Sequence, residues 1–119
     1  MTALFVYGTL KHAGQNHRHL AGQHFLGAAR TAPGFCLYAL DGYPGMVRQP
    51  GDPDGVLGEV WSVNAACLAQ LDQLEGLSEG LYRREPVPLL PPFTSQRVET
   101  YLYDRSTEGR LRLGAEWRG

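Results

Sequence analysis

The chain has 119 residues, of which 43% are hydrophobic and 19% are charged, and its formal net charge is −1. This length suits one domain, and the composition supplies enough apolar surface for a buried core, which excludes wholesale disorder. The 11 basic residues are balanced by 12 acidic ones, so no positive surplus exists to attract a phosphate backbone or an anionic membrane. We therefore expect a single domain over residues 1–119 with no nucleic-acid or membrane partner.

The N-terminal segment and the cysteines indicate where the protein resides. Residues 1–6 contain no basic residue, and no stretch of the chain approaches the ~20 apolar residues that a membrane-spanning helix needs. Cys36 and Cys67 form neither a CxxC pair nor the dense cysteine framework of a small secreted protein. These observations favour a reduced, cytoplasmic location.

Short apolar segments separated by turn residues predict a strand-rich domain. The 15 glycines and 8 prolines divide the chain into segments typical of strands joined by tight turns. The predicted strands comprise residues 3–7, 24–31, 35–40, 56–63, 82–89 and 97–103. The last two form a terminal hairpin whose connection includes residues 91–95, and the tail at 109–119 has no usable periodicity. Because so many short strands must protect their edges, we expect a closed or nearly closed β-barrel.

Two segments predict helices. One is short and follows Asn16, which we expect to cap it, and the other extends across residues 65–75. For the longer helix, Asn64 can cap the N-terminus and Gly76 can adopt the left-handed conformation after the C-terminus. The expected fold class is therefore α+β, a small mixed β-barrel with short helices.

The helix at 65–75 carries a carboxylate near its apolar side. Leu68, Leu71 and Leu74 define an apolar stripe, and Glu75 lies four residues after Leu71. The negative end of the helix dipole and partial desolvation would both raise the pKa of Glu75, which suits a general acid/base near neutral pH. The alternative is a side chain turned to solvent at a fraying helix end, which is the more common outcome for a glutamate before a glycine.

The segment Tyr7-Gly8-Thr9-Leu10 directly follows the first predicted strand. A glycine there allows consecutive backbone N–H groups to point toward one carboxylate or oxyanion. The alternative is a simple strand-ending turn in which Thr9 bonds to its own backbone. The sequence contains neither the GxGxxG pattern of a dinucleotide site nor the Gly-Lys-Ser/Thr of a P-loop.

Three further residues are candidates for the same site. Glu59 shares a strand face with Trp61, so it is either a rival base or a carboxylate that holds a loop through hydrogen bonds. Glu79 lies in a glycine-flanked loop, where we expect it to be solvated. Tyr82 opens a predicted strand and either offers its hydroxyl to a pocket or packs in the core.

The four histidines invite a metal-binding interpretation that their spacing does not support. His12, His17, His19 and His24 occur early in the chain, with no HExxH pattern and no cysteine or carboxylate among them. No serine lies in a GxSxG pattern, and neither cysteine has a neighbouring histidine in a known motif. We therefore expect no metal and no covalent nucleophile.

Six short motifs occur in an order that resembles a known family. They are FVYGTLK at 5–11, NH at 16–17, GYPG at 42–45, VLGEVW at 56–61, LDQLEG at 71–76 and YRR at 82–84. In this order they resemble the landmarks of the gamma-glutamylcyclotransferase-like family over roughly residues 4–103. The similarity is greatest to the AIG2-like branch, which includes short bacterial members and gamma-glutamylamine cyclotransferase.

The resemblance implies a fold and an activity. The fold would be a small mixed β-barrel with helices. The activity would be release of 5-oxoproline and a free amine from a gamma-glutamyl amine or gamma-glutamyl amino acid, without any cofactor. The alternative is a catalytically silent member of the same fold that binds a small metabolite.

The resemblance also implies roles for individual residues. Tyr7, Gly8, Thr9 and Leu10 would match the substrate-holding loop of the family, and Glu75 its acid/base carboxylate. Tyr82 would match a pocket tyrosine, although the seven-residue step from Glu75 to Tyr82 is slightly longer than the family spacing. The expected partner is a small gamma-glutamyl molecule, whereas the leaving amine and the oligomeric state are left open.

Overall fold

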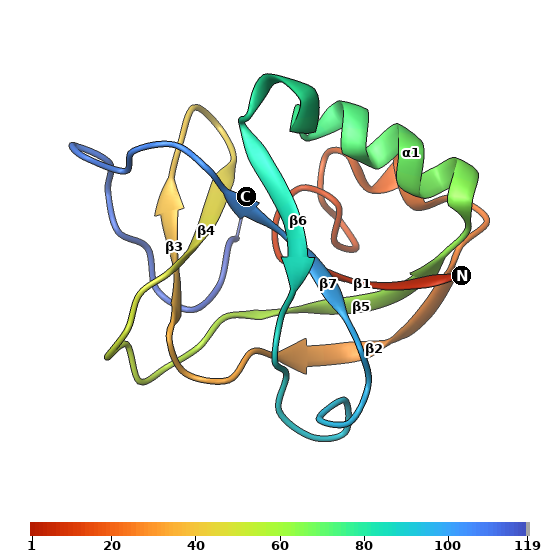
Figure 1. Ribbon diagram of the computed structural model, residues 1–119, viewed down its shortest axis with the longest axis horizontal. Coiled ribbons are helices and arrows are strands. Elements are labelled where there is room, and N and C mark those ends of the chain that lie inside the picture. The colour runs from red at the N-terminus through yellow and green to blue at the C-terminus, as the bar shows by residue number, and fades with distance from the viewer. Residues whose placement is uncertain (119) are drawn as a thin grey trace.

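Seven strands form one mixed sheet in the computed structural model, which describes residues 1–118 (Figure 1). The strands are β1 (Thr2–Val6), β2 (His24–Arg30), β3 (Phe35–Ala39), β4 (Pro44–Arg48), β5 (Leu57–Val63), β6 (Tyr82–Pro86) and β7 (Glu99–Tyr103). Their order is β2-β5-β1-β7-β4-β3, with β6 also paired to β7. The helical elements are α1 (Ala65–Leu74) and two 3-10 turns, η1 (His17–Leu20) and η2 (Leu77–Glu79). The expected α+β class is confirmed.

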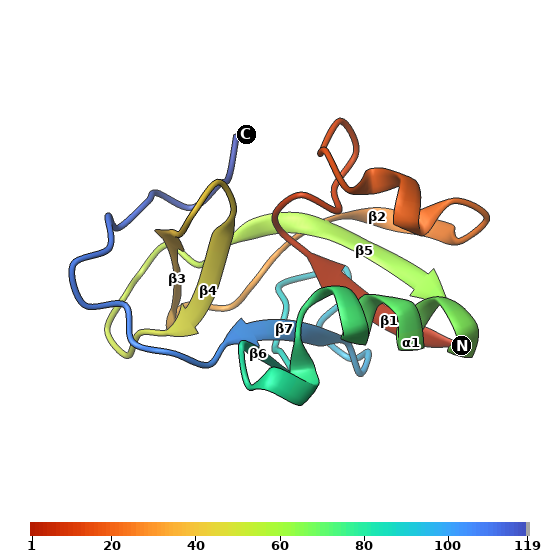
Figure 2. The same cartoon turned by 90° about the horizontal axis from the view of Figure 1, so that it is seen from above.

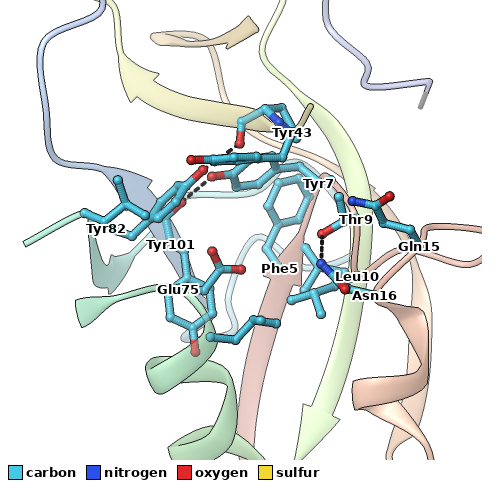
Figure 3. Close-up of a pocket in the computed structure, with 15 residues that line it drawn as sticks. Phe5, Tyr7, Thr9, Leu10, Gln15, Asn16, Tyr43, Glu75, Tyr82 and Tyr101 are labelled. Atoms are coloured by element: carbon cyan, nitrogen blue, oxygen red, sulfur yellow. Dashed lines mark hydrogen bonds between the residues drawn. The ribbon is translucent and has the colours of Figure 1, made fainter. Parts of the chain in front are cut away.

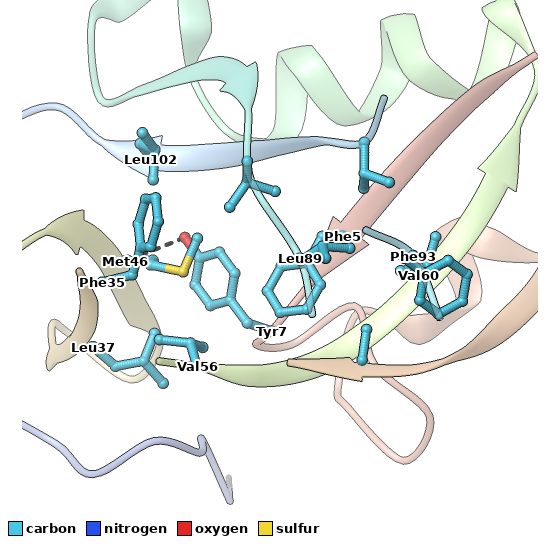
Figure 4. Close-up of a cluster of buried hydrophobic side chains, with 13 residues drawn as sticks. Phe5, Tyr7, Phe35, Leu37, Met46, Val56, Val60, Leu89, Phe93 and Leu102 are labelled. Carbon is cyan, nitrogen blue, oxygen red and sulfur yellow. Dashed lines mark hydrogen bonds between the residues drawn. The ribbon is translucent and has the colours of Figure 1, made fainter. Parts of the chain in front are cut away.

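The alternation of β1 divides the hydrophobic core into two parts. Leu4 and Val6 face α1, where they pack with Leu71. Phe5 and Tyr7 point to the opposite side, into the interior of the curved sheet (Figure 4). Because both faces of β1 are covered, its residues from Leu4 onward are buried without interruption.

The hydroxyl of Tyr7 joins three strands at a split in the sheet. β7 pairs in parallel with β1 at Thr100 and with β4 at Leu102. Between these points the Tyr7 hydroxyl donates to the carbonyl oxygen of Tyr101 at 2.6 Å and accepts from the N–H of Met46 at 3.2 Å. A side chain thus replaces ladder hydrogen bonds where β1 and β4 separate.

The sheet does not close into the expected barrel, although its strand content and fold class are as expected. Among residues 1–118, β2 and β3 lie at the two ends of the strand order and do not pair with each other. The C-terminal tail connects β3 to β5 instead: the N–H of Leu113 donates to Leu37, and the N–H of Leu57 donates to Ala115, both at 2.8 Å. Figure 2 shows this tail passing around the outer side of β3.

The predicted strands match the observed ones within a few residues, with one omission. β6 and β7 form the expected antiparallel terminal hairpin. The strand that the sequence did not predict is β4. It is short and begins with Pro44 and Gly45, two residues that are uncommon in strands. Its partner β3 forms five residue pairs with it, and a proline is tolerated at the first position of a strand.

Both predicted helices are present, α1 with its expected end signals and η1 as a short 3-10 helix directly after Asn16, but the expected cap of η1 is wrong. The side chain of Asn64 accepts a hydrogen bond from the N–H of Cys67 at 2.8 Å, and Gly76 adopts φ 65°, ψ 41°. Asn16 makes no side-chain cap to η1. Its Nδ2 group donates instead to Oγ1 of Thr9 at 3.0 Å, because the chain folds back onto the loop after β1.

The apolar stripe predicted on α1 is wrong at its C-terminal end. The buried side chains of this helix are Cys67 and Leu71, while Leu68 is partly buried and Leu74 is 42% exposed. Cys67 and Leu71 lie four residues apart, on the face of α1 that packs with core residues of β1 and β5. Both cysteines of the chain are free and buried.

None of the helices formed within residues 1–118 is both long and apolar enough to cross a membrane.

Candidate active site

A pocket of about 280 Å³ opens between the loop after β1, the C-terminal end of α1, and the start of β6 (Figure 3). The six residues to which the family resemblance assigns roles all line it, whereas the further candidates Glu59 and Glu79 do not. The six are Tyr7, Gly8, Thr9, Leu10, Glu75 and Tyr82. The size suits a small molecule and lies near the lower end of the usual range for ligand pockets.

Glu75 follows the last residue of α1 and carries the carboxylate of the pocket. Its N–H still donates to the carbonyl of Leu71 at 2.9 Å, after which the left-handed Gly76 ends the helix. The side chain therefore points into the pocket (Figure 3). Burial raises the pKa of Glu75 to about 7. No hydrogen bond or ion pair reaches this carboxylate from any other residue within 1–118.

Three tyrosines surround Glu75 with their hydroxyl groups already engaged. The hydroxyl of Tyr82 donates to the carbonyl of Pro44 at 2.7 Å, and that of Tyr7 donates to the backbone carbonyl of Tyr101. The third tyrosine is Tyr101 itself, whose hydroxyl donates to Asp72. Burial, together with the negative charge of Glu75, raises the pKa of all three tyrosines, so they stay neutral. Tyr82 is only 3% exposed, so it packs in the core and also lines the pocket.

Asp72 fixes the end of α1 to the sheet. Its Oδ1 atom accepts from the hydroxyl of Tyr101 at 2.7 Å and from Nε of Arg84 at 3.0 Å. Arg84 also pairs with Glu99. The residue that precedes Glu75 by three positions is thereby tied to both β6 and β7, which holds the helix end over the pocket.

The loop after β1 presents backbone N–H groups beside the pocket. Within residues 1–118, the N–H groups of Gly8, Thr9 and Leu10 donate to no acceptor. These three residues line the pocket, and because their N–H groups have no acceptor among the described residues, they are candidate donors to a bound carboxylate or oxyanion.

The remaining polar groups of this loop hold its shape. The carbonyl of Thr9 accepts from the N–H of Asn16 at 2.9 Å, and its hydroxyl accepts from the Asn16 amide. The carbonyl of Leu10 lies 2.9 Å from Nδ1 of His17. Gly8 lies so close to Pro44 that an added Cβ would be 2.7 Å from the proline ring. The loop is therefore fixed before any ligand arrives.

Glu59 lies outside the pocket and anchors the loop from the other side. Its carboxylate accepts from the N–H of His12 at 3.0 Å and from the indole N–H of Trp61 at 3.1 Å. The loop-holding interpretation of Glu59 is confirmed. Glu79 is exposed as expected, with its carboxylate accepting from the hydroxyl of Ser78 at 3.0 Å.

The histidines take part in packing near the loop. His12 and His17 stack with Phe25 and Trp61, with ring centroids 4.8 to 5.3 Å apart. In the described part of the chain, no group of three or more histidine, cysteine, aspartate or glutamate residues is arranged to hold a metal ion.

Several residues that line the pocket were not predicted from the sequence. They include Gln15, Asn16, Tyr43, Leu74, Leu81 and Tyr101. Tyr43 and Asn16 occur in the quoted motifs GYPG and NH, so the signal was present but was not used. The side chain of Tyr101 carried no local signal, because only the antiparallel pairing with Arg84 brings it beneath α1.

The fold and the pocket together define an enzyme-like site for a small molecule, with one unpaired, partly buried carboxylate in a pocket that is also lined by the loop after β1. Residues 4–119 match the family described as "Gamma-glutamyl cyclotransferase, AIG2-like", and the chain belongs to this family. It is thus a gamma-glutamylcyclotransferase-like enzyme, and the resemblance carried by the six motifs is confirmed.

Individual relatives and structures agree with this assignment. A protein of Vibrio cholerae serotype O1 is 43% identical over 98 residues, which is 82% of this chain and 80% of that protein. The zebrafish protein named Gamma-glutamylaminecyclotransferase A is 31% identical over 112 residues, which is 87% of this chain and 69% of that protein. The crystal structure of a uropathogenic Escherichia coli-specific protein superimposes with a TM-score of 0.82 at 27% identity, covering 98% of this chain and 92% of that one.

Proposed function

We propose that the protein releases 5-oxoproline and a free amine from a gamma-glutamyl amide, with Glu75 as the general acid/base. The observation that carries this proposal is the unpaired carboxylate of Glu75, whose pKa is raised to about 7 by burial. It faces a pocket that also presents the free N–H groups of Gly8, Thr9 and Leu10. Family membership supports the reaction class.

The proposed reaction is a cyclisation within the substrate. Ionised Glu75 takes a proton from the α-ammonium group, and the freed amine attacks the gamma-carbonyl carbon. The new C–N bond closes a five-membered lactam as the bond between this carbon and the leaving nitrogen breaks. Glu75 returns this proton to the leaving nitrogen. The attacking nitrogen loses a second proton as the lactam forms, and this proton passes to the released amine, which departs as an ammonium ion. The enzyme is thereby regenerated and no water is consumed.

The raised pKa of Glu75 matches the group that it must deprotonate. An α-amino group titrates near pH ~8. A carboxylate at its ordinary value would be more than three pKa units too weak a base, whereas a value of about 7 leaves a gap of about one unit. Burial of Glu75 therefore makes the proton transfer less unfavourable.

The loop after β1 would hold the substrate in its reactive shape. Its free N–H groups suit the α-carboxylate or the oxyanion that develops on the gamma-carbonyl oxygen. Because attack is intramolecular, holding the substrate folded supplies an effective concentration on the order of 10⁵ M or more. Fixed backbone donors are suited to this task, since they need no reordering.

The test is mass-spectrometric detection of 5-oxoproline after incubation with a panel of gamma-glutamyl amines and gamma-glutamyl amino acids. We expect release by the native protein and by the control Glu79→Gln, whose parent side chain is exposed, but not by Glu75→Gln. Equal release by Glu75→Gln would contradict its role. Binding of panel members without release by the native protein would identify a silent metabolite-binding protein instead.

A further inference from the structure

The C-terminal tail, residues 109–118, is tied to the sheet at several points. Two backbone hydrogen bonds described above join it to β3 and to β5. Arg112 pairs with Asp52, whose side chain is only 2% exposed, and Trp117 packs against the hydrophobic core inside the curved sheet. The tail is therefore a fixed support for any group that contacts it.

Lys11 connects this tail to the loop after β1. It directly follows the three residues whose N–H groups are free, and its Nζ atom donates to the carbonyl of Trp117 at 2.8 Å, across 106 positions of sequence. Among residues 1–118, no other hydrogen bond or ion pair joins residues 7–16 to the tail. Lys11 is partly buried, and none of the ion pairs formed by the described residues includes it. The carbonyl of Trp117 is thus the partner that sets the position of its ammonium group.

The loop after β1 is held to other elements at three points, apart from its buried apolar side chains. Gly8 packs against the first residue of β4, and the N–H of His12 donates to Glu59 on β5. Lys11 is the third point, on the tail. The hydrogen bonds from residues 16 and 17 lie within the same stretch of chain, so they keep the shape of the loop without placing it on the sheet.

A second pocket, of about 410 Å³, lies between the loop after β1 and the tail. Gly8 and Thr9 line both this pocket and the pocket of Glu75, so the loop backbone separates two open spaces. Lys11 and Trp117 line the second pocket as well, and their hydrogen bond bridges the loop and the tail there. Without this bond, the loop would have room to move toward the tail and carry its N–H groups away from Glu75.

We propose that Lys11 is a positioning residue, which holds the loop after β1 on the C-terminal tail through the carbonyl of Trp117 and so keeps the N–H groups of residues 8–10 at the pocket of Glu75. The tail is thereby part of the scaffold of the active site. Because the donor is charged, this hydrogen bond is stronger than one between neutral groups, which suits the one polar contact on this side of the loop. The inference rests on the proposed function and adds a role within the same site.

Substitutions of Lys11 test the role of its ammonium group. Lys11→Met keeps an apolar stem but no donor, so kcat/KM for 5-oxoproline release from the best compound of the panel should fall about tenfold. Lys11→Arg keeps a charged donor and should recover kcat/KM to within about threefold of the native value. Arg30→Met is the matched control, because Arg30 also donates to a backbone carbonyl, that of Asp54, but does not line the pocket of Glu75. The control should stay within about twofold of the native protein.

A double-mutant cycle tests whether Lys11 acts through the tail. Trp117→Ala removes the side chain that holds the acceptor carbonyl in place, so it should also lower kcat/KM. Because both substitutions break the same contact, the double variant should lose no more than the weaker of the two single variants. Leu111→Ala is the control within the tail, since this side chain is 70% exposed, and it should leave kcat/KM unchanged. If Trp117→Ala does not fold, Trp117→Leu, which retains more of the packing, takes its place in the cycle.

NMR tests the same contact without any turnover. Lys11 is the only lysine of the sequence, so labelling with ¹³C at the lysine Cε gives a single methylene signal. Trp117→Ala should move this signal toward that of a free lysine. Lys11→Met should lower the backbone order parameters of residues 8–10 from about 0.85 to about 0.6 or less, whereas Arg30→Met should not.

The outcomes separate this inference from the proposed function. Native kcat/KM in Lys11→Met, no recovery in Lys11→Arg, or additive losses in the double variant would each overturn the inference while the cyclisation itself stands. If no compound of the panel yields 5-oxoproline, the proposed function fails and the NMR measurements decide the inference alone. An unchanged lysine signal in Trp117→Ala, or unchanged order parameters in Lys11→Met, would then overturn it, and changes in both would support it.

Discussion

Glu59 and Glu75 are two partly buried carboxylates near the loop after β1, and their surroundings are opposite. The carboxylate of Glu59 accepts from the N–H of His12 and from the indole of Trp61. The carboxylate of Glu75 receives no donor from residues 1–118, and burial raises its pKa to about 7. One side chain anchors the loop, and the other faces the pocket that the loop borders.

The difference follows from where each residue lies in the secondary structure. Glu59 is on β5, opposite the end of β1, so the loop that leaves β1 can present an N–H to it. Glu75 follows α1, and a helix C-terminus exposes carbonyl groups rather than N–H donors. A carboxylate there is left unpaired unless a side chain reaches it, and an unpaired buried carboxylate is suited to proton transfer.

The largest effect should come from removing the reactive carboxylate. Glu75→Gln keeps the shape of the side chain but cannot accept a proton, so kcat should fall by about 10³-fold, within the usual range for a general acid/base. The melting temperature should not fall, because the buried charge had no partner to lose. Steady-state release of 5-oxoproline and thermal unfolding measure both quantities.

Glu59→Gln provides the control for this comparison. Its kcat should stay within about tenfold of the native value, since Glu59 lies outside the pocket and does not meet substrate. A kcat loss as large as that of Glu75→Gln would erase the distinction between the two carboxylates.

The next largest effect is the dependence of kcat/KM on pH. The base is the ionised form of Glu75, and its pKa is raised to about 7. Below that value the protonated form dominates, so kcat/KM should rise about tenfold per pH unit from about pH 5 and level off above about pH 7. A profile that is flat from about pH 5.5 upward would show an ordinary carboxylate and contradict the role of burial.

A smaller effect is expected from crowding the loop. An added Cβ at Gly14 would lie 2.2 Å from the carbonyl oxygen of Thr9, so Gly14→Ala must displace the backbone beside the free N–H groups. We expect a loss of about 1 to 3 kcal/mol in the free energy of unfolding and a raised KM. Gly114→Ala is the control, since nothing lies within 4 Å of its added Cβ. Equal denaturation midpoints for the two variants would refute a tightly fixed loop.

The smallest effect should be the stability change in Glu59→Gln. Replacing one carboxylate oxygen by an NH₂ group leaves the backbone donor of His12 or the indole of Trp61 without its charged acceptor. The free energy of unfolding should fall by about 1 kcal/mol, which urea titration can resolve. No change in stability would mean that the hydrogen bonds to Glu59 contribute little to the free energy of unfolding, and that other contacts hold the loop after β1 in place.

The parts of the site that depend on local signals could be predicted from the sequence. Asn64 and Gly76 mark the ends of α1 with a capping side chain and a left-handed glycine, and these signals place Glu75 at the helix end. The Gly8 turn after an apolar strand likewise indicated a loop with free donors. Six ordered motifs then supplied the family.

The parts that depend on long-range pairing could not be predicted. Tyr7 was expected in the substrate loop and does line the pocket, but its hydroxyl also joins β7 and β4, through residues that lie 94 and 39 positions away along the chain. The contact of Tyr101 with Asp72 needs the register of β7 under α1, which no local pattern reveals. Leu74 appeared to continue an apolar stripe, but it is 42% exposed and lines the pocket instead of packing in the core.

The most direct test of the central claim is to titrate the side-chain carboxyl carbon of Glu75 by ¹³C NMR, with Glu75→Gln used to assign its signal. Because burial without a partner raises the pKa, we expect a midpoint at about 7, clearly separate from those of the exposed carboxyl groups. A midpoint near the ordinary value of 4.5 would show that Glu75 is solvated or paired, and would contradict its role as the acid/base of the pocket.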